Sequence, residues 1–133
     1  MRTFVLALAI AVSGSALADI EPGNWEMTVS TQVEGIPAGA LAPIVQTRCL
    51  TREDARDPSR LVGGAGCEFS DRRDTGSEMS FNVSCGGQLP MRGSGLVRYT
   101  SQSVDGSLEL SAETGGQKIM TRSRVVGRRL GAC

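Results

Sequence analysis

The fold is decided by residues 97–123, VRYTSQSVDGSLELSAETGGQKIMTRS, which contain two hairpin signals between segments of alternating polar and apolar residues. Asp105-Gly106 and Gly115-Gly116 both favour a two-residue turn between antiparallel strands. We therefore predict three consecutive antiparallel strands in this stretch, joined by a turn at each dipeptide.

The two turns predict a register in which opposite charges lie side by side. The first turn aligns Arg98 with Glu113, and the second aligns Glu113 with Lys118. A second row has the same form, and its members are Gln102, Glu109 and Arg122. The apolar residues fall on the opposite face of the three strands: Val97, Tyr99, Leu108, Leu110, Ala112 and Ile119. Charge and hydrophobicity thus favour the same register.

Further strands are predicted towards the N-terminus. Residues 24–33 and 78–85 alternate polar with apolar side chains, which is typical of half-buried strands, and another strand runs near 44–50. A strand that begins with Cys67 and Phe69 folds against residues 78–85 as a hairpin.

The N-terminus has the features of an export signal. Arg2 precedes the apolar run 4–12 (FVLALAIAV), and residues 16–18 (ALA) form a small-x-small cleavage motif. The run is shorter than the roughly 20 residues that a membrane span needs. We therefore expect a signal peptide over residues 1–18, no membrane span, and a single mature domain of residues 19–133 in the oxidising periplasm.

Four cysteines in a small exported domain predict two disulfides. A turn at residues 75–77 places Cys67 opposite Cys85, where the Cβ atoms of an antiparallel pair lie about 4.5–5.5 Å apart. We therefore predict a Cys67–Cys85 disulfide and, by elimination, a second disulfide between Cys49 and Cys133.

One short helix is predicted between the second and third strands. Thr51 and Asp54 have the spacing of a capping box, and Pro58 ends the segment. With about seven antiparallel strands connected as sequential hairpins, we predict an all-β domain, a meander that is closed as a small barrel or folded as a sandwich.

The composition excludes several classes of function. The chain has 133 residues, no histidine, and 14 basic against 14 acidic residues. The commonest general base and metal ligand is therefore missing, and the balanced charge gives no reason to expect nucleic-acid binding. The arginines between Arg122 and Arg129 are interpreted as a salt-bridged strand face, with an anion site as the alternative. We expect no enzyme activity, no metal and no cofactor.

Four features together resemble a known family. They are residues 22–26 (PGNWE), residues 49–55 (CLTREDA), the hairpin that joins Cys67 to Cys85, and residues 127–133 (GRRLGAC). In their order and spacing, these features resemble the bacterial domain-of-unknown-function family numbered 3617, whose members are small exported proteins of proteobacteria. The resemblance covers nearly the whole mature chain. It implies a periplasmic single domain with no assigned activity and no catalytic residues.

A shorter motif is similar to the lipocalin-type barrels. Gly23-Asn24-Trp25 matches the Gly-x-Trp at the start of their first strand. In those folds an arginine from the last strand packs over the tryptophan, and the resemblance implies this role for Arg128 or Arg129.

The predicted inner face mixes small hydroxyls with few bulky groups, because only four of the five aromatic residues lie beyond residue 18. An interior gap is therefore expected, which is either a shallow amphiphilic pocket or a water-filled end of a small barrel. In the predicted register a row of hydroxyls shares this face with aromatic and aliphatic side chains, and its members are Ser101, Ser103, Thr121 and Ser123. The candidate pocket residues are Trp25, Phe81, Tyr99, Ser101, Leu110 and Thr121.

These features predict a periplasmic, non-enzymatic binding protein. In the first hypothesis a small apolar ligand lies inside the barrel, where Ser101 and Thr121 orient its polar end and Tyr99 and Leu110 cover its apolar body. In the alternative, the protein is an adaptor or a structural envelope protein that binds a periplasmic protein through its surface.

The export signal predicts the N-terminus of the mature protein. Since the cleavage motif ends at Ala18, the exported chain should begin at Asp19. Intact-mass and N-terminal analysis of the exported protein checks this, and an intact Met1 in the exported fraction contradicts it.

Overall fold

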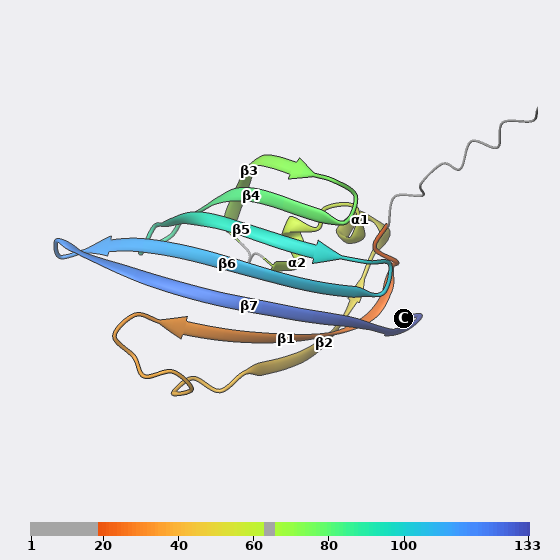
Figure 1. Cartoon of the computed structure of the whole chain (residues 1–133), viewed down its shortest axis with the longest axis horizontal. Helices are drawn as coiled ribbons and strands as arrows, with labels where there is room; N and C mark the ends of the chain where they lie inside the picture. The colour runs from red at the N-terminus through yellow and green to blue at the C-terminus, as the bar shows by residue number, and fades with distance from the viewer. Residues whose placement is uncertain (1–18, 63–65) are drawn as a thin grey trace, which may run out of the picture.

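The chain forms one antiparallel sheet of seven strands, with two short helices on one of its faces (Figure 1). The computed structural model describes residues 19–62 and 66–133, so the predicted signal peptide lies outside the described residues. The elements are β1 (Gly23–Val33), β2 (Ile44–Leu50), α1 (Arg52–Ala55), α2 (Ser59–Val62), β3 (Cys67–Asp74), β4 (Glu78–Cys85), β5 (Met91–Tyr99), β6 (Ser103–Thr114) and β7 (Gln117–Gly131). The prediction of an all-β chain with about seven antiparallel strands is confirmed.

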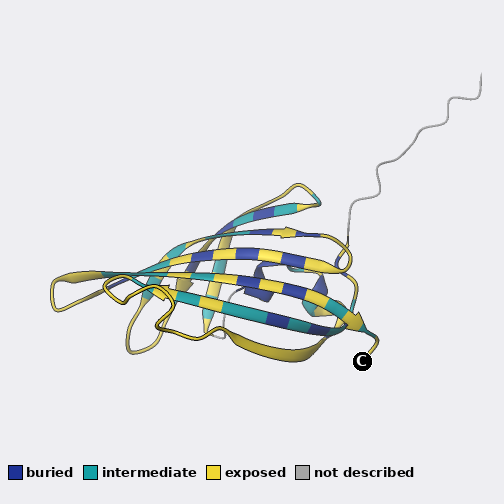
Figure 2. Cartoon of the chain, turned by 60° about the horizontal axis from the view of Figure 1, so that its bottom comes forward, coloured by how far each residue is buried: buried dark blue, intermediate teal, exposed yellow. Residues whose placement is uncertain are grey.

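The strand order is β2-β1-β7-β6-β5-β4-β3. Strands β3 to β7 form a meander, and β1 and β2 form a separate hairpin. Pairing of the first strand with the last, from Asn24 opposite Gly131 to Val33 opposite Thr121, joins the two parts into one sheet. Strands β1, β4, β5, β6 and β7 bury alternate residues along part of their length, which appear as bands along the ribbons in Figure 2.

The predicted closure as a barrel or a sandwich is wrong. The sheet is curled but open, and β2 and β3 lie at its two edges. Closing a barrel requires hydrogen bonds between the edge strands. Here the segment that connects β2 to β3 carries α1 and α2 instead, and the buried side chains of Leu61 and Val62 pack on the concave face. The interior is thus filled by the chain's own connection between the two edges.

The predicted turn at Asp105-Gly106 is also wrong. The chain turns earlier, at residues 100–103, and Arg98 lies opposite Asp105 instead of Glu113. The hydroxyl of Thr100 accepts hydrogen bonds from the amides of Gln102 (3.2 Å) and Ser103 (3.0 Å), so side-chain oxygens stabilise this turn. Consequently Ser101 is exposed in the turn, not directed inwards.

Gly106 lies within β6, at a position that has no room for a side chain. A Cβ atom at residue 106 would overlap the Cγ1 atom of Val62, which packs there from α2. The error shifts the pairing of β5 and β6 by an even number of residues, so the inward and outward faces of both strands are still predicted correctly. The Gly115-Gly116 turn is confirmed, with Glu109 opposite Arg122 and Glu113 opposite Lys118.

Both disulfides have the predicted pairing. Cys67 lies opposite Cys85 in the β3–β4 hairpin, and the two are bridged. Cys49, in β2, is bridged to Cys133. The predicted capping box is confirmed as well, since the Thr51 hydroxyl accepts a hydrogen bond from the Asp54 amide (3.2 Å). Two helices occur where one was predicted, because the chain turns again after Pro58.

None of the helices in the described part of the chain has the length and apolar character to cross a membrane.

Removing the Cys49–Cys133 disulfide should cost more stability than removing Cys67–Cys85. The bridges join residues 84 and 18 positions apart, and loop-closure entropy assigns them stabilisations of about 4.6 and about 3 kcal/mol respectively. We expect the Cys49→Ser/Cys133→Ser variant to lose roughly 1–2 kcal/mol more than the Cys67→Ser/Cys85→Ser variant in urea denaturation. A larger loss for the second variant contradicts this account.

Candidate functional site

Five of the six predicted pocket residues lie on the concave face, but Tyr99 and Phe81 line different recesses. Trp25, Phe81 and Tyr99 are buried, Leu110 and Thr121 are half-buried neighbours across β6 and β7, and Ser101 is exposed outside the group. Tyr99 lines a recess beside α1, whereas Phe81 lines another beside β3. The hydroxyl row is reduced to Thr121 and Ser123, and the Ser123 hydroxyl lies 3.3 Å from that of Thr31.

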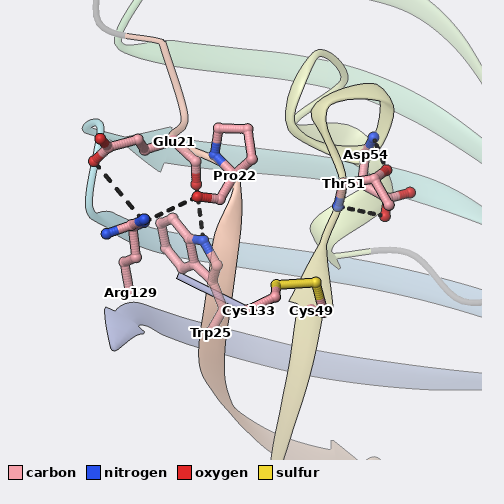
Figure 3. Close-up of a disulfide and its surroundings, with 8 residues drawn as sticks. All are labelled: Glu21, Pro22, Trp25, Cys49, Thr51, Asp54, Arg129 and Cys133. Atoms are coloured by element: carbon pink, nitrogen blue, oxygen red, sulfur yellow. Dashed lines mark hydrogen bonds and ion pairs between the residues drawn. A yellow bond between two sulfur atoms is a disulfide. The ribbon is translucent and has the colours of Figure 1, made fainter. Parts of the chain in front are cut away.

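Trp25 and Arg129 fasten the segment that precedes β1 (Figure 3). The Trp25 indole donates a hydrogen bond to the carbonyl of Glu21 (3.0 Å), and Arg129 Nε donates to the carbonyl of Pro22 (3.0 Å). The Glu21 amide in turn donates to the Ser101 carbonyl (2.9 Å) in the β5–β6 turn. Arg129 lies opposite Trp25 in the register of β1 and β7. These groups therefore hold the end of the sheet together.

The convex face is a ladder of ion pairs. Its pairs are Arg128–Glu26 (3.0 Å), Arg124–Asp105 (2.8 Å), Arg122–Glu109 (2.8 Å) and Arg98–Glu78 (2.9 Å). The hydrogen bonds from Arg124 lower the pKa of Asp105 below its ordinary value. The interpretation of this arginine-rich stretch as a salt-bridged strand face is confirmed for Arg122, Arg124 and Arg128, whereas Arg129 lies on the other face opposite Trp25. Exposed pairs of this kind contribute little stability each.

A recess of about 350 Å³ lies between α1 and the start of β1, with Tyr99 in its wall. The Tyr99 hydroxyl donates a hydrogen bond to the Asp74 carboxylate (2.5 Å). Burial raises the pKa of Tyr99, and the carboxylate of Asp74 raises it further. Arg52, Arg56 and Asp19 also line this recess, so it carries charged side chains beside its apolar ones.

An exposed apolar segment is the most unusual surface feature. Residues 35–45, GIPAGALAPIV, contain no polar or charged side chain, and every one of them is exposed. The exposed fractions are 45% for Ile36, 44% for Leu41, 63% for Ile44 and 60% for Val45. Apolar residues scattered singly on a surface need no explanation, but a contiguous apolar patch marks an interaction site.

A second recess, of about 410 Å³, adjoins this segment. Val33, Ile36, Ala38 and Met120 give it apolar walls, and Gln32, Glu34 and Arg122 lie at its polar side. The apolar segment and this recess together form the candidate binding surface. Eleven consecutive residues without a polar side chain are a signal in the sequence itself, but the predicted binding sites did not include them.

The cysteines and one carboxylate of the sequence have structural roles. The cysteines are bridged, and the Asp54 carboxylate, whose pKa is lowered by the Thr51 amide, caps α1. Residues 19–62 and 66–133 contain no group of three or more acidic or cysteine side chains arranged to hold a metal ion.

Tyr99 makes the fold sensitive to alkaline pH. Its folded-state pKa lies above its unfolded value of about 10, so the unfolded state ionises first and stability is lost as the pH rises beyond about 10. Since Tyr99 is the only tyrosine, tyrosinate absorbance reports on it alone. We expect that absorbance to appear only as the protein unfolds, and Tyr99→Phe to remove the alkaline loss of stability. Titration of the folded protein near the ordinary pKa contradicts this.

Comparison with known proteins gives a family but no activity. No curated protein matches the chain, and no solved structure matches it. Residues 20–133 match the family described as "Protein of unknown function (DUF3617)". The matched region contains all seven strands and both disulfides. The chain therefore belongs to the DUF3617 family.

Proposed function

We propose that this protein is a non-enzymatic binding protein that engages a partner protein through the exposed apolar segment 35–45. One observation carries the proposal: eleven consecutive residues without a polar side chain are all exposed. Leaving apolar area in water costs roughly 25 cal/mol per Å² relative to burial, so a surface of this kind is favoured when a partner covers it.

The arrangement of the rest of the molecule supports binding through the surface over binding inside the sheet. The concave face near the helices is filled by Leu61 and Val62, and the convex face is occupied by ion pairs. The apolar segment lies apart from these side chains, in the β1–β2 connection and the first two residues of β2 (Figure 1).

We further infer that the protein acts in an oxidising compartment outside the cytoplasm, as its export-signal-like start suggests. The two disulfides support this inference, since such bonds persist mainly in oxidising surroundings.

Site-specific photo-crosslinking in the producing cells tests the proposal. A crosslinking amino acid at Leu41 should give a discrete protein adduct, and one at Ser107, an exposed residue of the convex face, should not. Ile36→Asp in the Leu41 background should abolish the adduct and change the free energy of unfolding by no more than about 0.5 kcal/mol, as is usual for exposed positions.

Two results contradict the proposal. Equal labelling from Leu41 and Ser107 means that the segment has no preferred partner. An adduct with the mass of a small lipid-like molecule, matched by uptake of a fluorescent apolar probe, favours the carrier hypothesis over protein binding.

A further inference from the structure

The outer edge of β2 is unpaired and unprotected. In the described part of the chain β2 pairs only with β1, so the backbone N–H and C=O groups along its other side have no strand opposite them. Six of its seven residues are exposed, and only Leu50 is buried. A free edge of this kind is a template for the addition of another strand.

The opposite edge of the sheet is protected, which makes β2 distinctive. β3 carries five charged residues among its eight, and a bulge interrupts its pairing with β4. Asp71, in that bulge, has a positive φ of 51°. Charges and bulges are the usual devices that keep edge strands from pairing. β2 has one charge, Arg48, among seven residues and no bulge.

The register with β1 shows which side chains of β2 lie on each face of the sheet. Ile44 and Arg48 lie opposite Val29 and Trp25, so they point to the concave side, whereas Val45 points to the convex side. An added strand would therefore meet aliphatic side chains at the N-terminal end of β2 and a guanidinium near its C-terminal end. Arg48 forms no ion pair with any residue that the structure describes. Its charge contributes to the lowered pKa of Asp54, but that carboxylate already caps α1.

Charge decides between a second copy of this chain and a different partner. β2, IVQTRCL, contains no carboxylate. Antiparallel pairing of two β2 strands along their whole length would place Arg48 opposite Gln46 of the second copy, leave the two arginines diagonal to each other on one face, and supply neither with an acid. A segment that carries an acidic residue satisfies Arg48, and like charges across an interface are unfavourable.

We propose that β2 accepts an extended segment of the partner protein as an eighth, antiparallel strand, with an acidic residue beside Arg48 and aliphatic residues opposite Val45 and Ile44. This inference rests on the proposed function, since it states how the partner of the apolar segment docks. Main-chain hydrogen bonds to β2 provide the affinity, and the side chains on the two faces provide the selectivity.

A capped heptapeptide, Ser-Thr-Glu-Thr-Thr-Val-Ile, tests the proposal directly. Paired antiparallel from Leu50 to Ile44, it places its glutamate opposite Arg48 and its valine opposite Val45. In an amide NMR titration of the full mature protein, the largest shifts should map to β2 and the adjoining β1. The same peptide with N-methylated main-chain nitrogens keeps the side chains but loses donors, so it should not bind.

Matched variants distinguish strand pairing at the β2 edge from nonspecific hydrophobic association of the peptide. Val45→Lys places a charge on the edge strand and should weaken peptide binding by about tenfold or more. Val126→Lys alters a valine of comparable exposure, 42% against 60%, on the interior strand β7 and should leave the affinity within about twofold. Arg48→Glu should reverse the preference, so that a peptide with lysine in place of glutamate binds better.

Three results overturn the proposal: no shift in β2 at millimolar peptide, equal binding of the N-methylated peptide, or a homodimer in sedimentation that Val45→Lys dissociates. Its failure is distinct from failure of the proposed function. If the Leu41 crosslink persists while the peptide does not bind, a partner still covers the apolar segment but does so without adding a strand.

Discussion

The pairing of β1 with β7 is the constraint on which the rest of the structure depends. It joins a two-stranded hairpin to a five-stranded meander. An isolated two-stranded hairpin is at best marginally stable, so β1 and β2 depend on this pairing. Gly127 makes the pairing tight, because a Cβ atom there would lie 2.6 Å from the Met27 sulfur and 3.6 Å from the Trp25 ring. The Cys49–Cys133 bridge then ties β2 to the C-terminal residue after β7.

This arrangement explains why the sheet has two unlike edges. Since the first and last strands meet in its interior, the edges are β2 and β3, which are neighbours in sequence but lie at opposite sides of the sheet. The connection between them must cross the concave face, and α1 and α2 fill the space that a closed barrel would enclose. The exposed apolar segment runs into the start of β2, so this segment and the free strand edge lie on the same side of the sheet.

Local patterns predicted local structure well. The alternation at 24–33, the cysteine hairpin and the Gly115-Gly116 turn all depend on residues that are close in sequence or directly opposed, and the structure confirms each of them. The β5–β6 turn was misplaced because Gly106 resembles a turn residue. Its small size is required by Val62, which lies 44 positions away along the chain, and a single sequence does not reveal that contact.

The candidate site was harder to predict for the same reason. Ser101 was assigned to the interior only because the turn was misplaced, and barrel closure depends on whether two distant edges meet. The apolar run at 35–45 was readable from the sequence, but its exposure became evident only from the fold. Burial of a loop is decided by the elements packed around it, and composition alone does not determine them.

Amide hydrogen exchange of the monomeric mature protein tests the central claim, that the sheet is open with β2 as a free edge. Alternate amides of β2 should exchange rapidly because they face solvent, while the intervening β2 amides and those of β1 and β7 are protected by their partners. Uniform protection along β2 in the monomer would mean that a second strand pairs with it and would contradict the account.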